Sequence, residues 1–201
     1  AVIARDFWSA KKGRDALMVE WDESGAAKTS TDALRDQYLE LAKQPGAVAA
    51  NQGDAAKTLT SAAKMLEAEF TVPYLAHAMM EPLVCVAQIK DDACEIWAGS
   101  QLQTLDQAIA AKIAGLKPEQ VTIHTLLAGG SFGRHATPTA DYIAEAVATA
   151  KAARELNAPI RLMWTREDDI KGGYYRPLFV HRLAAGLDVQ GKPTAWLQRI
   201  V

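Results

Sequence analysis

Apolar residues recur along this chain at two spacings, and each spacing predicts a different kind of secondary structure. Apolar side chains three or four residues apart predict amphipathic helices. The segments with this spacing are residues 6–17, 34–42, part of 47–63, 102–114 and 140–156. Short apolar runs and alternation of apolar with polar residues predict strands. These patterns occupy residues 1–4, 18–21, 66–72, 83–89, 94–97, 121–127 and 160–164, with a last hairpin that turns at 190–192. Because both kinds of element alternate throughout, the predicted fold class is α+β, with mixed sheets and packed helices.

Both ends of the chain have the pattern of a strand. Residues 1–4 begin it with no methionine or leader in front, and the alternating residues 194–201 end it without a polar tail. We therefore expect a piece of a longer protein, with residues 1–201 forming a fragment of one domain and a candidate subdivision near residues 73–82. A site that is assembled from distant segments would then be only partly present.

The composition narrows the class of protein. Of the 201 residues 49% are hydrophobic, and 22 basic residues nearly balance 24 acidic ones. Such a chain folds into a globule and offers no basic surface to nucleic acid, so no nucleic-acid partner is expected. Charges interrupt every apolar run, so we expect no membrane span. Two cysteines, Cys85 and Cys94, are too few for a disulfide scaffold and leave the cellular compartment open.

The strongest chemical signal is the loop Gly-Gly-Ser-Phe-Gly-Arg at residues 129–134, between a predicted strand and a predicted helix. Glycines permit backbone conformations in which amide N–H groups face a ligand, so the loop predicts a cradle for a phosphate, pyrophosphate or oxo-anion. It lacks the first glycine of the dinucleotide fingerprint and the Gly-Lys-Ser/Thr of a P-loop. The alternative is a tight turn with no ligand. Phe132 either covers something bound or plugs the core.

The same loop also permits a serine hydrolase. Ser131 has a glycine two residues to each side, Gly129 and Gly133, and it follows a strand and precedes a helix, as a nucleophile elbow does. In this alternative His181 or His135 is the base, and Asp168 is the nominal acid.

Several other polar residues have a structural and a functional interpretation. The four histidines are scattered without metal-ligand spacing, so each is expected to be structural, with only His135 a candidate for lining a site. Glu81, at the entrance to an apolar strand, is either capped by backbone amides or functional. Gln101 is either a hydrogen-bonding residue at a helix start or a ligand contact. The acidic run 167–169 either binds a cation or forms a solvated face.

Three motifs follow one another along the chain. They are Ala-His-Ala-Met-Met-Glu-Pro at residues 76–82, Ile-Trp-Ala-Gly-Ser-Gln at 96–101 and the glycine loop at 129–134. Their order and separations resemble those of the molybdenum-binding subunit of the xanthine dehydrogenase and aldehyde oxidase family.

Three further segments resemble one branch of that family more specifically. These are Trp-Asp-Glu at residues 21–23, Trp-Thr-Arg-Glu-Asp-Asp at 164–169 and Tyr-Arg-Pro at 175–177. They are similar to the isoquinoline 1-oxidoreductase β-subunit branch, which includes cytochrome-linked aldehyde dehydrogenases. The resemblance covers nearly the whole chain.

The resemblance implies a molybdenum pterin cofactor, in this branch often its cytosine dinucleotide form, and a fold that is part of the domain binding it. It implies an oxidoreductase that hydroxylates aldehydes or N-heterocycles (azaarenes) with oxygen from water. Electrons would leave through a separate iron–sulfur subunit, with a cytochrome c as a further candidate acceptor. By motif match, the cofactor-binding residues are Gln101, Gly129, Gly130, Ser131, Phe132, Gly133 and Arg134. None is a direct metal ligand, and Ser131 becomes a loop substituent rather than a nucleophile.

The chain departs from the family pattern at one position of the loop and at the two positions that follow it. Ser131 stands where the branch usually has a glycine, and His135 stands where it has an arginine. Ala136 replaces the carboxylate of the xanthine-oxidising branch, which disfavours purine oxidation. The glutamate base of the family belongs to a distant C-terminal segment that has no match here. The piece alone is therefore expected to hold no catalytic residue, to bind no cofactor and to be inactive, and the parent could be a bacterial cytoplasmic or periplasmic protein.

Overall fold

The computed structural model describes residues 1–201 and divides them into two compact units. The first, here called the four-stranded unit, comprises residues 1–20 and 76–175. The second, the three-stranded unit, comprises residues 21–75 and 176–201. Each unit is described by itself.

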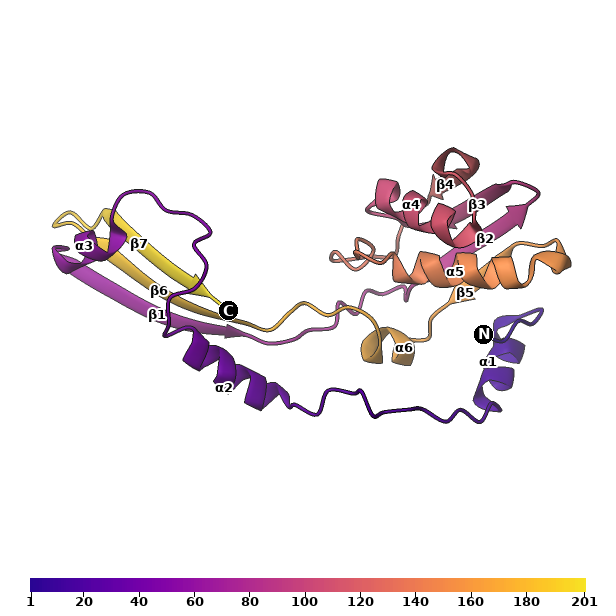
Figure 1. Ribbon diagram of the computed structural model, residues 1–201, viewed down its shortest axis with the longest axis horizontal. Helices are drawn as coiled ribbons and strands as arrows, with labels where there is room; N and C mark the ends of the chain where they lie inside the picture. Colours follow the sequence, from indigo (N-terminus) through magenta and orange to yellow (C-terminus); the bar gives the residue numbers. More distant parts are fainter. The chain divides into compact units, whose positions relative to one another are not determined.

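The three-stranded unit is an antiparallel sheet with two helices. The strands β1 (Lys64–Val72), β6 (Phe179–Leu187) and β7 (Pro193–Ile200) lie side by side in the order β1-β6-β7 (Figure 1). Two helices, α2 (Thr31–Leu41) and α3 (Ala55–Thr60), contact this sheet. The predicted last hairpin and the predicted strand before Pro73 are therefore confirmed.

The four-stranded unit contains a mixed sheet in the order β4-β3-β2-β5. Its strands are β2 (Val84–Lys90), β3 (Ala93–Ala98), β4 (Val121–Thr125) and β5 (Ile160–Met163). Neighbours are antiparallel except for β3 and β4, which run parallel. One parallel pair within an otherwise antiparallel sheet confirms the α+β class, because a parallel pair needs a crossover, here a helix.

Two helices cover one face of this sheet, as Figure 1 shows. These are α4 (Gln103–Ala114), which crosses from β3 to β4, and α5 (Asp141–Ala152). Alternate side chains of β2 and β3 face them and are buried, because successive strand residues point to opposite faces. Alanines at the facing positions of both helices let them approach closely, and Gly115 ends α4 in the left-handed conformation, with φ 79°.

The remaining helices of the four-stranded unit are short. They are α1 (Phe7–Asp15), α6 (Arg166–Lys171) and the single 3-10 turns η1 (Pro118–Gln120) and η2 (Arg154–Leu156). None of the helices in the chain has both the length and the apolar character needed to cross a bilayer.

Two predicted strands are wrong. Residues 1–4 and 18–21 belong to no sheet, and the side chain of Met18 is 99% exposed. A short apolar run favours a strand only where a neighbouring strand completes its backbone hydrogen bonds, and neither segment has such a neighbour.

The interpretation of the charged run 167–169 as a solvated face also needs correction. These residues lie in α6, which begins with a capping box in which the Thr165 hydroxyl accepts a hydrogen bond from the Asp168 amide. Asp169 is buried and paired with Arg166 at 2.7 Å. No group of three or more His, Cys, Asp or Glu side chains could hold a metal ion, so the cation alternative finds no support.

Candidate functional site

Three loops of the four-stranded unit meet at one edge of its sheet. Because β3 and β4 are parallel, the segments that follow them, residues 99–102 and 126–140, both leave from this edge. The antiparallel neighbour β2 begins at the same edge, so residues 76–83 arrive there. Ligands of α/β proteins commonly bind outside the carboxyl ends of parallel strands, and this edge carries two such ends.

The glycine loop has left-handed backbone at three of its residues. The φ angles of Gly130, Phe132 and Gly133 are 101°, 54° and 96°. Left-handed backbone is uncommon for a bulky residue such as phenylalanine, and such strain gathers at functional sites. The Phe132 side chain is 79% exposed, so the alternative in which it plugs the core is wrong.

Four amides of the loop, those of residues 130–133, have no hydrogen-bond acceptor within the chain. The main-chain nitrogens of Phe132 and Gly133 donate no hydrogen bond to any group of the chain, whereas Arg134 donates to the carbonyl of Ser131 at 3.0 Å. A Cβ placed on Gly133 would meet no atom within 4 Å, so the space beside it is open. Successive free N–H groups in turn conformation form a concavity that suits an anion or a metal-bound oxo group.

Glu81 holds the start of the loop. The Gly129 amide donates to Glu81 Oε2 at 2.8 Å, and the Glu81 amide donates to the Gly129 carbonyl at 3.2 Å. A Cβ on Gly129 would lie 2.5 Å from the Glu81 Cβ, so the close approach requires glycine at this position. Of the two interpretations of Glu81, the structure supports the carboxylate that is capped by a backbone amide.

Ser131 joins the glycine loop to the loop after β3. Its buried hydroxyl donates to Gln101 Oε1 at 2.5 Å and accepts from the His135 amide at 3.0 Å. Gln101 itself is exposed. Two residues that the sequence singled out separately, thirty positions apart, are therefore in direct contact.

The serine hydrolase alternative is wrong. The Ser131 hydroxyl has no hydrogen bond to a histidine ring, because its partners are the Gln101 amide oxygen and a main-chain nitrogen. The nominal acid Asp168 binds Arg14 and the Thr165 amide. His181 belongs to the three-stranded unit, where its Nδ1 lies 3.2 Å from Gln198 Nε2. A nucleophile needs a base within hydrogen-bond reach, and none is present.

Arg134 faces inward and anchors the loop to α5. Its side chain is almost fully buried, and two of its nitrogens bind the Asp141 carboxylate at 3.0 and 2.7 Å. The guanidinium also lies over the rings of Trp164 and Tyr174, 5.4 and 6.0 Å from their centroids. Burial alone would raise the pKa of Asp141, yet the hydrogen bonds from Arg134 hold that pKa below its ordinary value.

His135 lies beneath the loop rather than at its surface. The residue is 6% exposed, and its ring Nδ1 has no hydrogen-bond partner. Burial lowers the pKa of His135, because a charged imidazolium loses its hydration there. Its ring is tilted against that of Tyr142, with centroids 5.3 Å apart. The neutral ring packs under the glycine loop and also forms part of the wall of the cavity beside it, so His135 lines this candidate site.

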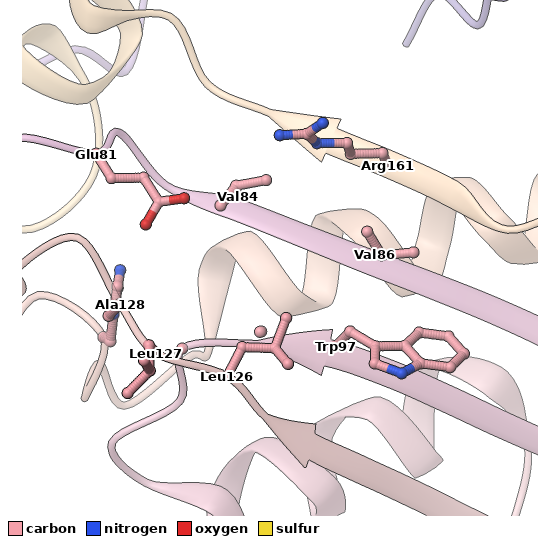
Figure 2. Close-up of a pocket in the computed structure, with 11 residues that line it drawn as sticks. Glu81, Val84, Val86, Trp97, Leu126, Leu127, Ala128 and Arg161 are labelled. Atoms are coloured by element: carbon pink, nitrogen blue, oxygen red, sulfur yellow. The ribbon is translucent and has the colours of Figure 1, made fainter.

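A cavity of about 230 Å³ opens beside the loop, on the face of the sheet that α4 and α5 do not cover. Figure 2 shows Glu81 and Arg161 on one side of it and residues 126–128 with Trp97 on the other. Neither Arg161 nor Trp97 was predicted to be a site residue, although Trp97 lies within the motif at 96–101. The available signal was strand alternation, since Trp97 follows the buried Ile96 and so points to the other face.

These features define an α+β domain with a cradle of main-chain amides at a sheet edge. Residues 41–201 match the family described as "Molybdopterin cofactor-binding domain", and the chain belongs to that family. The match spans both strands that lead into the site and the whole glycine loop, as the resemblance of the motifs predicts.

Two relatives have the same sequence identity to this chain. The chain is 31% identical over 196 residues to a protein of Gluconacetobacter polyoxogenes named membrane-bound aldehyde dehydrogenase [pyrroloquinoline-quinone], covering 96% of this chain and 25% of that protein. It is 31% identical over 198 residues to isoquinoline 1-oxidoreductase subunit beta of Brevundimonas diminuta, covering 93% of this chain and 25% of the relative. The chain thus spans about a quarter of the length of these relatives.

Solved structures share the fold. The aldehyde oxidoreductase of Desulfovibrio gigas matches with a TM-score of 0.61 and 23% identity, over 74% of this chain and 16% of that one. The quinoline 2-oxidoreductase of Pseudomonas putida 86 matches with a TM-score of 0.62 and 18% identity, over 73% and 18% of the two chains.

Proposed function

We propose that residues 1–201 are part of the molybdenum-binding domain of an oxidoreductase that hydroxylates aldehydes or N-heterocycles of the isoquinoline type with oxygen from water. Family membership and the names of the two relatives support this function. The observation that carries it is the run of unused amides at residues 130–133, which includes Phe132 and Gly133, with open space beside Gly133.

The residues present fit the cofactor that the family implies. The amides of Phe132 and Gly133 are donors without partners, and Gln101 offers an exposed carboxamide at the same sheet edge. In the proposed site, Gln101 and the loop 129–134 hold the molybdenum pterin, with Arg134 acting through its anchor on Asp141. When bound, that cofactor supplies the redox chemistry of the hydroxylation. The chain's own residues orient it with fixed donors, which need no reorganisation during the reaction.

The finer parts of the proposal concern the whole protein. The pterin is proposed to be the cytosine dinucleotide form, and electrons to leave through a separate iron–sulfur subunit and then a cytochrome c. The proposal includes an inactive isolated chain, because the family's base glutamate has no counterpart among these residues. The proposed function is compatible with a whole protein located in the cytoplasm or in the periplasm.

Cofactor analysis of the full-length protein tests the proposal. Protein purified from a molybdenum-replete host is expected to contain molybdenum and to release a fluorescent pterin on denaturation. The release of pyrroloquinoline quinone without molybdenum, which the name of the Gluconacetobacter relative would suggest, contradicts the proposal. So does protein that contains neither cofactor. Nucleotide analysis of the released pterin decides the cytosine dinucleotide form.

A further inference from the structure

The contact between Ser131 and Gln101 fixes the direction of a short chain of hydrogen bonds. A peptide N–H can only donate, so the His135 amide donates to Ser131 Oγ, at 3.0 Å. The single hydroxyl proton of Ser131 is then directed to the Gln101 side chain, 2.5 Å away. The atom that receives it must be an acceptor, which identifies it as the carboxamide oxygen.

The opposite orientation of the carboxamide is disfavoured. With the NH₂ group of Gln101 turned toward Ser131, the serine oxygen would accept two hydrogen bonds, and its own proton would have no partner. Ser131 is only 9% exposed, so water does not readily replace that partner. A buried donor without an acceptor costs about 1–3 kcal/mol, which is enough to select one orientation over the other.

The main chain on either side of Gln101 is fixed as well. Ser100 donates from its hydroxyl to Asp106 Oδ2 at 2.5 Å and accepts from the Leu102 amide at 3.3 Å. Its carbonyl accepts from Gln103 Nε2 at 3.0 Å. Asp106 is fully buried, and burial raises its pKa, so the Ser100 contact is made within the core rather than at the surface. Gln101 is therefore held at both ends, by Ser100 through the backbone and by Ser131 through the side chain.

We propose that Ser131 is a positioning residue that sets the Gln101 carboxamide with its oxygen inward and its NH₂ group outward. The Gln101 Nε2 atom donates no hydrogen bond within the chain, so both of its N–H groups stay free at the edge where the Phe132 and Gly133 amides are also free. The Gln101 carboxamide thereby presents donors rather than an acceptor, which suits an oxo or anionic group. This inference rests on the proposed function for what those donors face, while the orientation itself does not depend on it.

The first measurement detects the hydrogen bond to Ser131 by deuterium exchange and needs no enzyme assay. In the full-length protein, Ser131→Ala removes the acceptor of the His135 amide, so deuterium exchange in the peptide covering residues 131–136 is expected to accelerate about tenfold. Ser131→Thr keeps the hydroxyl and is expected to restore slow exchange. Thr149→Ala, which removes a hydroxyl that bonds to the carbonyl of Glu145 within α5, is the matched control and is expected to leave this peptide unchanged. Unchanged exchange in Ser131→Ala overturns the proposal.

The second measurement is a double-mutant cycle in the molybdenum-loaded enzyme, with dye reduction by substrate as the assay. Ser131→Ala is expected to lower kcat about tenfold, and Ser131→Thr to recover it to within about twofold. In a Gln101→Ala background the Ser131→Ala change is expected to have no further effect, because there is no carboxamide left to orient.

The remaining outcomes overturn the proposal. Equal losses from Ser131→Ala in both backgrounds would mean that the serine acts independently of Gln101. Loss of molybdenum from Ser131→Ala but not from Gln101→Ala would mean that the serine holds the loop rather than the carboxamide. A parent enzyme without molybdenum removes the proposed function instead, and the exchange measurement still tests the hydrogen bond from the His135 amide to Ser131 on which the orientation rests.

Discussion

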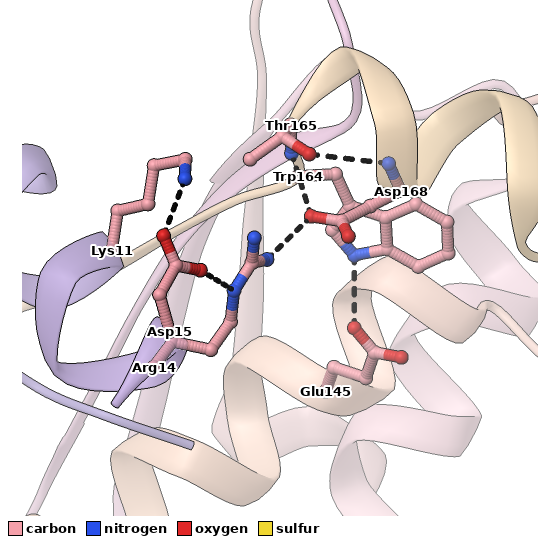
Figure 3. Close-up of polar contacts among 7 residues, drawn as sticks. All are labelled: Lys11, Arg14, Asp15, Glu145, Trp164, Thr165 and Asp168. Atoms are coloured by element: carbon pink, nitrogen blue, oxygen red, sulfur yellow. Dashed lines mark hydrogen bonds and ion pairs between the residues drawn. The ribbon is translucent and has the colours of Figure 1, made fainter. Parts of the chain in front are cut away.

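Arg14 of α1 and Asp168 of α6 form an ion pair across 154 positions of sequence, with Nη1 and Oδ2 2.7 Å apart. Figure 3 shows that the same carboxylate also accepts a hydrogen bond from the Thr165 amide, at 2.9 Å. One aspartate therefore starts α6 and fastens α1 to it. Since none of residues 1–20 is buried, this tether holds the N-terminal helix in the four-stranded unit.

The substitution Asp168→Asn should loosen α1. It removes the charge that Arg14 pairs with, and the expected cost is about 1 kcal/mol, because Asp168 is partly exposed and solvent screens the pair. The loosening of α1 is measured as faster deuterium exchange in residues 7–15 of the full-length protein. Lys11→Gln, which removes an exposed pair with Asp15 and leaves the Arg14–Asp168 contact in place, is the control and should change exchange less. Equal effects of the two variants would contradict the assignment of Asp168 as the tether.

The same carboxylate predicts a pH dependence. Burial tends to raise the pKa of Asp168, but hydrogen bonds from Thr165 and Arg14 outweigh it, so the pKa lies below its ordinary value of 3.8. A lowered folded-state pKa contributes stability above the ordinary value, and that stability is lost as pH falls through the lowered one. Urea unfolding at a series of acidic pH values should therefore show a shallower loss of stability in Asp168→Asn than in the parent. Parallel curves would contradict this prediction.

Replacing Arg134 by another side chain should destabilise the protein. Replacing it by methionine keeps much of the buried volume but leaves the Asp141 carboxylate without its two hydrogen bonds, and breaking such a buried pair costs about 3–5 kcal/mol. Urea unfolding of the full-length protein measures the loss. The double variant Arg134→Met with Asp141→Leu removes both charges and should recover part of it. If the double variant loses as much free energy of unfolding as the two single variants lose together, the pair is not coupled.

Gly129→Ala should destabilise the protein for a steric reason. The new Cβ would lie 2.5 Å from the Glu81 Cβ, which is close to the main chain and cannot swing aside. Overpacking of this kind costs about 1–3 kcal/mol. A lower urea midpoint for Gly129→Ala measures it, and combining it with Glu81→Gly should recover part of the loss by moving the obstacle. No recovery would show that the loop conformation, rather than the contact with Glu81, decides the cost.

Long periodic segments of the sequence were sufficient to predict most of the fold. The predicted helix at 102–114 is confirmed, and the left-handed Gly115 that follows its apolar stripe is the residue type that ends a helix. The short apolar runs at 1–4 and 18–21 failed, because a strand exists only where a partner pairs with it. Local pattern carries no information about that partner.

The site could be predicted in its parts but not in its connections. The resemblance of the motifs pointed to Gln101 and the glycine loop, yet their contact depends on β3 and β4 being parallel neighbours, which strand patterns do not reveal. The inward direction of Arg134 is equally hidden, because an arginine next to a glycine is as compatible with a surface as with a buried pair. The partner Asp141 carries no signal beyond its place at the start of an alanine-rich helix.

Gly133→Ala tests whether the open side of the loop matters for function. The position has φ 96°, which strains any residue with a Cβ by about 1 kcal/mol or more, while the space beside it is free of protein atoms within 4 Å. The expected result is a full-length protein that folds but retains several-fold less molybdenum, because the methyl group occupies the space that the cofactor would approach. Gly25→Ala, another glycine with open space around it but without a left-handed backbone, should retain the parent amount. Undiminished molybdenum in Gly133→Ala, measured by metal analysis with the urea midpoint as a check on folding, would remove the amide cradle from the proposed cofactor site.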